Sequence, residues 1–103
     1  MDLKRVYVSD LLMVWEKFQQ VQLLFPFYSS HGEARSEYLE AVKKGRGYWL
    51  QNKSQWLLIE KIDEDDGWRI NNLLISRELG WETAFLFLEK AARQQFKRAL
   101  YIN

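Results

Sequence analysis

Residues 68–103 read WRINNLLISRELGWETAFLFLEKAARQQFKRALYIN and decide the fold. Trp68–Ser76 is an apolar-rich run of strand length, and Arg77–Trp81 is a short turn with one glycine. Residues 82–96 repeat apolar side chains at helical spacing, and residues 98–103 return as a strand. A strand whose loop opens a helix N-terminus is a frequent way to build an anion or phosphate site. We therefore expect any chemistry of this chain to lie here.

Composition limits the class of protein. The 103 residues fit a single domain over 1–103, and 48% hydrophobic with 16% aromatic residues supply ample core material. The net charge of +1 argues against nucleic acid as a partner, because such binders usually carry a marked basic excess. The absence of cysteine excludes disulfides and thiolate catalysis. No apolar run approaches the ~18–20 residues of a membrane span, and Met1–Arg5 lacks a signal-peptide core, so we expect a cytoplasmic protein without membrane contact.

A strand and a helix are expected at the N-terminus. Lys4–Val8 predicts a short strand, and Ser9 or Asp10 then suits a helix N-cap. The apolar residues that recur at helical spacing after this cap, with Val21 as an extension, are Leu11, Leu12, Trp15 and Phe18. The helix must end before Pro26, because the residue before a proline avoids the helical region.

The middle of the chain predicts a second helix and a hairpin. The helix runs from Glu33 to Lys44, with Gly45 as its C-terminal stop. Its expected buried positions are Tyr38, Leu39 and Val42. Residues 47–51 and 55–62 are two strands around a polar turn, and 63–67 is an acidic turn.

The element order is therefore β-α-α-β-β-β-α-β, an α+β fold with a mixed sheet. Most strands are expected to be antiparallel, and the last helix should cross between two parallel neighbours. Apolar residues alternate in the strand at 68–76 and recur at helical spacing in 82–96, and together they predict one common core. Its members are Ile70, Leu74, Phe85, Leu88, Ala92 and Leu100.

At this point the chain resembles the GNAT superfamily of acyl-CoA-dependent N-acyltransferases. The element order matches the N-terminal part of that fold. The loop pattern Arg/Gln-x-x-Gly-x-Gly/Ala of the family is matched at Arg77 and Gly80, whereas Glu82 replaces its last small residue. Residues 87–102 look like the family's third helix and fifth strand, and are particularly similar to short GNAT-like proteins found in phage genomes. The resemblance spans nearly the whole chain.

The resemblance implies a cofactor site for acetyl-CoA. In the family, the fourth strand, the pyrophosphate loop and the third helix form this site. Carried onto this chain, the cofactor-binding residues are Arg77, Leu79, Gly80, Trp81, Glu82 and Thr83. The helix dipole and backbone amides would favour a pyrophosphate, but the Glu82 carboxylate competes with a bound anion. The alternative interpretation is a plain strand–helix turn in which Glu82 stabilises the first turn.

Candidates for catalysis are few. Catalytic family members continue with a fourth helix and two strands, often with a tyrosine general acid, whereas this chain ends at Asn103. The candidate general base is Glu60, which could equally be solvated. His31 is expected in a surface loop, and no metal site is expected. The oxygen ligands of residues 63–67 are out of register for calcium.

Two classes of function remain. The first is a non-catalytic GNAT-like binding or assembly protein, phage-encoded as a virion or accessory protein in the host cytoplasm. The second is an acetyl-CoA-dependent N-acetyltransferase, completed by oligomerisation. The strand at Arg98–Asn103 lies close to a sheet edge, and edges invite pairing with another chain. We therefore expect a homo-oligomer or larger assembly with Trp or Tyr side chains in the contact.

Overall fold

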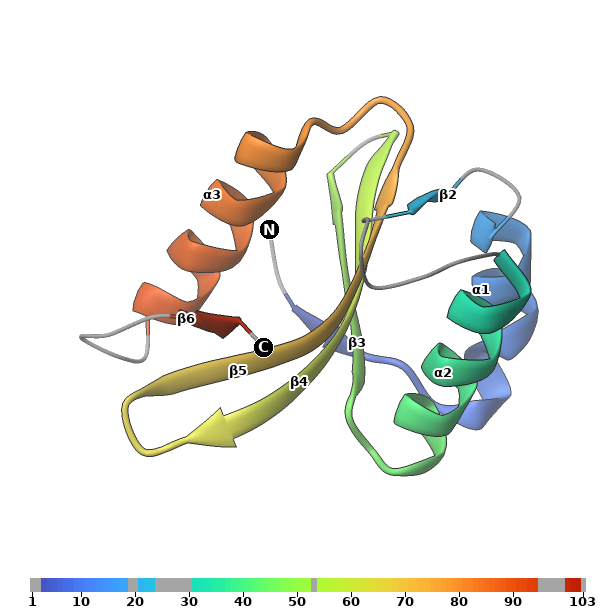
Figure 1. The fold of residues 1–103 in the computed structure, drawn as a ribbon, viewed down its shortest axis with the longest axis horizontal. Helices are drawn as coiled ribbons and strands as arrows, with labels where there is room; N and C mark the ends of the chain where they lie inside the picture. The colour runs from blue at the N-terminus through green and yellow to red at the C-terminus, as the bar shows by residue number, and fades with distance from the viewer. Residues whose placement is uncertain (1–2, 19–20, 24–30, 53, 95–99, 103) are drawn as a thin grey trace.

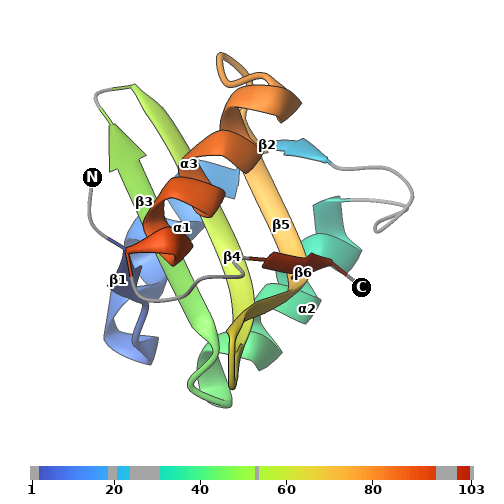
Figure 2. The ribbon, with the colours of Figure 1, turned by 90° about the vertical axis from the view of Figure 1, so that its left-hand side faces the viewer.

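A six-stranded sheet lies between two layers of helices. The computed structural model describes residues 3–18, 21–23, 31–52, 54–94 and 100–102. Helix α3 covers one face of the sheet, and α1 and α2 cover the other (Figures 1 and 2). The fold is therefore α+β, as expected.

The elements follow one another in the order predicted, with two additions. They are β1 (Lys4–Arg5), the 3-10 helix η1 (Val8–Asp10), α1 (Leu11–Phe18), β2 (Val21–Leu23), α2 (His31–Lys43), β3 (Gly47–Asn52), β4 (Gln55–Glu64), β5 (Gly67–Ser76), α3 (Trp81–Arg93) and β6 (Leu100–Ile102). The sheet order is β1-β3-β4-β5-β2, and β6 also pairs with β5. The pairs along this order are antiparallel, whereas β5 and β6 are parallel, as expected for the strands that flank α3.

The additions correct the predicted element order. Strand β2 was not expected, and it pairs with β5 from Val21 opposite Ser76 to Leu23 opposite Leu74. Three residues are too few to show the two-residue period of a strand in the sequence. The strand is recognised only from its pairing with the edge of β5. The first strand ends at Arg5, and Val8 belongs to η1 instead. Parts of the predicted last helix and last strand, residues 95–99 and 103, lie outside the described residues.

The sheet separates two apolar cores, and this corrects the expectation of one. Ile70, Leu88 and Ala92 belong to the core between the sheet and α3, with Phe85 packed against its border. Leu74 is also fully buried, but it lies in the core under α1 and α2. The side chain of Leu100 lies outside the described residues. Ile70 and Leu74 would share a face in a regular strand, but β5 has an extra residue, Asn71, between them, so they lie on opposite faces and in different cores.

The apolar face of α1 also differs from the prediction. Leu12 is 74% exposed, whereas Val14 is fully buried. Leu11 and Trp15 pack against the same core as Val14, as i, i+3 and i+4 spacing from Leu11 requires, and Leu12 lies outside this stripe. At the start of η1, Asp10 Oδ2 accepts a hydrogen bond of 2.8 Å from the Tyr7 N–H.

Helix α2 ends as predicted at Gly45. This residue has a φ of 77°, a conformation that glycine adopts without strain. The Arg46 N–H donates to the Ala41 carbonyl at 2.9 Å, and the Gly45 N–H donates to Val42 at 3.0 Å. These two bonds form a Schellman motif. They fix Arg46 beside the sheet, where it takes part in the site described next.

Candidate functional site

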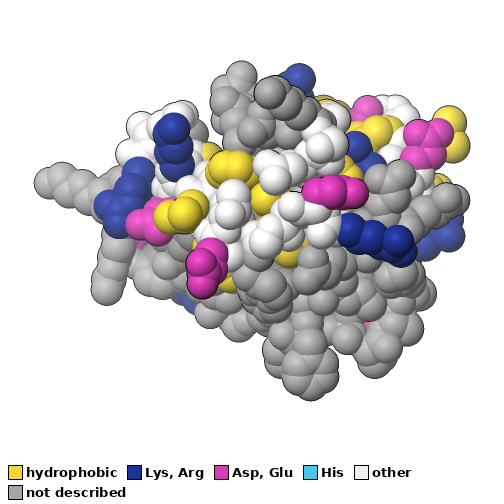
Figure 3. Space-filling view, turned by 90° about the horizontal axis from the view of Figure 1, so that it is seen from above, with side chains coloured by type: hydrophobic (Ala, Val, Ile, Leu, Met, Phe, Trp, Pro, Cys, Tyr) yellow, Lys and Arg dark blue, Asp and Glu magenta, His cyan; other side chains and the backbone are white. Residues whose placement is uncertain are grey.

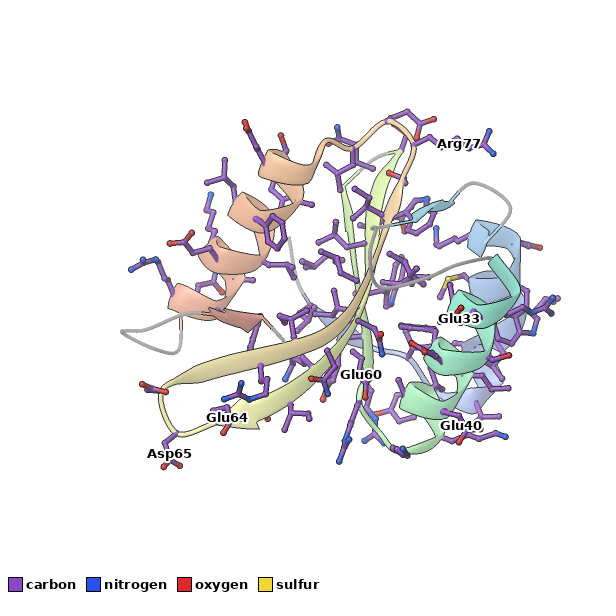
Figure 4. The ribbon with its side chains drawn as sticks, viewed as in Figure 1. Glu33, Glu40, Glu60, Glu64, Asp65 and Arg77 are labelled. Carbon is purple, nitrogen blue, oxygen red and sulfur yellow. The ribbon has the colours of Figure 1, made fainter. Side chains whose placement is uncertain are left out.

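A surface pocket of about 330 Å³ lies between α2 and strands β4 and β5. Helix α2 forms one wall and the sheet forms the other (Figure 4). The lining residues are Ser36, Glu37, Glu40, Ala41, Lys44, Glu60 and Asn72. Three carboxylates and one ammonium group therefore share a small concave surface. Such pockets with convergent polar groups are the usual place for a small ligand.

A β-bulge brings Glu60 and Asn72 together. Strand β4 pairs Glu60 with Asn72 but pairs the next residue, Lys61, with Ile70, so Asn71 is the extra residue. Beyond the bulge, Ile70 faces α3, while Leu74 faces α2. The Asn72 side chain therefore lies on the α2 side and donates a hydrogen bond through Nδ2 to Glu60 Oε1.

Glu60 is a buried carboxylate with partners on two sides. The residue is 8% exposed. Besides the Asn72 amide, Arg46 Nη1 lies 3.9 Å from Glu60 Oε2. The Arg46 side chain is 43% exposed, so this long ion pair contributes at most about 1 kcal/mol. The carbonyl of Arg46 also accepts a hydrogen bond of 3.0 Å from the Lys61 N–H, which ties the end of α2 to β4 at the bulge.

Glu37 is the residue whose protonation the pocket alters. Glu37 is an exposed residue, and partial loss of hydration on its pocket side raises its pKa; the negative charges of Glu33 and Glu60 raise it further. Glu40 on the same wall is exposed and forms a surface ion pair of 3.6 Å with Lys43. The crowding of carboxylates therefore disfavours the ionised form of Glu37, and a cation in the pocket would relieve this repulsion.

The predicted pyrophosphate loop lies at the other end of β5. Gly80 is the N-cap of α3 and receives no side-chain capping bond, and Ala84 donates to its carbonyl at 3.0 Å. A Cβ built on Gly80 would meet nothing within 4 Å. Leu79 is buried, whereas Arg77, Glu82 and Thr83 are exposed, and the Trp81 side chain lies outside the described residues. The described part of this end carries acidic and basic side chains side by side (Figure 3).

The predicted site residues therefore fall in two places. Glu60 faces the α2 pocket near the middle of the sheet, while Arg77 lies beyond the upper end of β5 (Figure 4). Asn72, the partner of Glu60, precedes the strand end at Ser76 by about 13 Å along the strand. The edge of β5 beside the loop, Leu74–Ser76, is paired with β2.

Sequence reasoning missed most of the pocket. Glu37 escaped notice, although the spacing of Glu33, Glu37 and Glu40 places three carboxylates on one side of a helix. Alternation places Asn72 on the same face as Leu74, but its position opposite Glu60 depends on the register between β4 and β5, which the sequence does not show. His31 begins α2 instead of lying in a loop, and its side chain is outside the described residues.

Within the described ranges, no group of three or more His, Cys, Asp or Glu residues could hold a metal ion. The described helices include none that is long and apolar enough to cross a membrane. Comparison with protein-family models, curated proteins and solved structures finds no match for this chain. The pocket between α2 and the sheet and the loop at Gly80 are therefore the two features of this chain that bear on its function.

Proposed function

We propose that this chain is a GNAT-like binding domain, not a complete enzyme, and that it holds a small cationic amine in the pocket between α2, β4 and β5. The observation that carries the proposal is the buried Glu60 carboxylate in a pocket where the pKa of Glu37 is raised. An ammonium group would offset the repulsion among these carboxylates. The ammonium group would also donate a charge-assisted hydrogen bond to the Glu60 carboxylate.

The neighbouring groups favour a small ligand with one charged end. Asn72 already donates to Glu60 through its amide nitrogen, and its carbonyl oxygen can accept a hydrogen bond. Lys44 on the lining and Arg46 beside Glu60 would repel a ligand that carries several cationic groups close together. The pocket is also open to solvent, which suits an amine attached to a larger molecule.

NMR titration with butylamine tests this function, with butan-1-ol as the uncharged probe of similar shape. We expect butylamine to shift the amide signals of Glu37, Glu60 and Asn72, and Glu60→Gln to weaken binding by about 10- to 100-fold, the range for a charged hydrogen bond. The matched control is Glu64→Gln, on the same strand but paired with Arg69 at 2.6 Å. Equal shifts with butan-1-ol, or unchanged binding by Glu60→Gln, would contradict the proposal.

The second candidate is an acetyl-CoA-dependent N-acetyltransferase, and the open, uncapped turn at Gly80 favours it. In this reading the pyrophosphate lies against the amides between Leu79 and Thr83, and the pocket amine is the acyl acceptor. Glu60, or Glu37 with its raised pKa, would accept the amine proton. The exposed carboxylate of Glu82 opposes this reading because it repels phosphates.

Calorimetric titration with acetyl-CoA separates the two candidates. If the loop binds the cofactor, Arg77→Ala should weaken binding by about 1.5–3 kcal/mol, because a charged hydrogen bond is lost. Glu82→Gly should strengthen it, because a like charge is removed. Micromolar binding by the wild-type protein, with acetyl transfer to an amine, would favour the enzyme over the binding domain.

The resemblance to short GNAT-like phage proteins supports a phage origin for this chain. It favours an accessory or virion protein in the host cytoplasm. The near-neutral charge favours protein or small-molecule partners over nucleic acid.

A further inference from the structure

The large apolar side chains most exposed in the described part of the chain fall on two opposite layers. Tyr7, Val8 and Leu12 are 54%, 57% and 74% exposed, and all three lie at the start of the η1–α1 segment. We call them the α1 patch. Leu86, at 63% exposed, lies on the outer face of α3. Contiguous exposed apolar groups often mark contacts with another protein.

The α1 patch has opposite charges at its two ends. Val8, Leu12 and Glu16 follow one another at four-residue spacing, so the exposed Glu16 carboxylate lies one turn beyond Leu12. At the other end, the Arg5 guanidinium lies 4.7 Å from the centre of the Tyr7 ring. Arg5 is exposed, so this end of the α1 patch carries a positive charge that an anionic partner can reach.

The outer face of α3 carries the opposite arrangement. Glu82, Leu86 and Lys90 follow one another at the same four-residue spacing, and all three are exposed. A carboxylate therefore precedes the leucine by one turn, and an ammonium group follows it. Glu82 and Lys90 are separated by about 12 Å along the helix. We call Glu82, Leu86 and Lys90 the α3 patch.

We propose that the α1 patch of one copy of this chain binds the α3 patch of a second copy. The apolar groups pack around Leu86, Arg5 pairs with Glu82, and Glu16 pairs with Lys90. Because the sheet separates α1 from α3, the two patches lie on opposite sides of each molecule (Figure 1). The contact is therefore heterologous, and its repetition builds a ring or an open chain of copies. A net charge of +1 adds little repulsion between copies.

This contact gives Glu82 a role that a phosphate site does not. Its carboxylate opposes a bound anion at the start of α3, whereas it complements Arg5 of a neighbouring copy. The proposal is independent of the amine pocket, which lies on the sheet between α2 and β5. Glu60→Gln should therefore leave the assembly unchanged.

Sedimentation velocity over a range of concentrations tests the contact. We expect the wild type to form species larger than a monomer. Leu12→Asp and Leu86→Asp should each be monomeric, because each destroys one of the two patches. An equimolar mixture of these variants keeps one intact patch on each chain, so it should form a dimer and nothing larger. Asp65→Asn, in the exposed β4–β5 turn, is the matched control that should assemble normally.

Charge reversal gives a second, separate test. Arg5→Glu and Glu82→Arg should each raise the dissociation constant by about 2- to 30-fold, and the double variant should recover most of this loss. Unfolding midpoints close to the wild-type value exclude misfolding as the cause. A monomeric wild type, no dimer in the leucine-variant mixture, or association of Leu86→Asp alone would overturn the proposal.

Discussion

Gly47→Ala tests how α2 is held against the sheet. Gly47 begins β3 and pairs with Glu60 across the sheet, so it lies beside the candidate pocket. A Cβ built there would stand 2.6 Å from Val42 Cγ2 and 3.2 Å from Val42 Cα. Optimal carbon–carbon contacts are about 3.5–4.0 Å. Val42 cannot simply rotate away, because valine has one strongly preferred rotamer in a helix and its Cα belongs to the backbone. The helix must therefore move.

The expected cost follows from overpacking a buried site. Such insertions destabilise by about 1–3 kcal/mol, which exceeds the gain of about 0.4–1 kcal/mol that Gly→Ala usually brings by restricting the unfolded chain. In a domain of this size, each kcal/mol lowers the melting temperature by roughly 4–8 °C. Because α2 carries Glu37 and Glu40, the same shift should also weaken butylamine binding.

Urea unfolding measures the effect, with Gly80→Ala as the matched control. Gly80 has a φ of −77° and open space around its built Cβ, so this variant should stay within about 0.5 kcal/mol of the wild type. Equal stability of the Gly47→Ala and Gly80→Ala proteins would refute the close approach of α2 to β3.

Two further predictions concern single side chains. Leu88→Ala should destabilise by about 2–5 kcal/mol because Leu88 is fully buried, whereas Leu86→Ala on the exposed face of the same helix should change stability by less than about 0.5 kcal/mol in urea unfolding. NMR titration should find the pKa of Glu37 above its ordinary value. Because this pKa is raised in the folded state, the contribution of Glu37 to stability should improve as the pH falls from neutral through that pKa, and Glu37→Gln should abolish this dependence.

Most helices and strands of the fold were predicted from strong local patterns in the sequence. The β3–β4 hairpin, the two long strands β4 and β5, and the helix after Gly80 were predicted near their observed positions, since each has many residues in one period. The stop of α2 at Gly45 was also predicted, because a left-handed glycine ends helices by local geometry. The predictions failed where few residues carry a signal, as at β2 and in the phase of α1.

The candidate site was predictable only in part. Glu60 was named as a candidate, but its partners were not, because Arg46, Asn72 and Glu37 come from three different elements. The turn between β5 and α3 was predicted at Arg77–Trp81, and the structure has it at residues 77–80, because Trp81 already begins α3. Nothing in the sequence indicated that this loop and Glu60 would lie at separate places along the sheet.

The α+β class, the order of the long elements and the turns between them could be predicted from the sequence, because these depend on residues close together along the chain. Which side chains contact one another depends on the tertiary structure. The register of β4 against β5 sets Asn72 opposite Glu60, and the extra residue Asn71 changes the face on which β5 side chains lie, so Ile70 and Leu74 belong to different cores. Strand pairing and layer packing join residues far apart along the chain, and no local period contains that information.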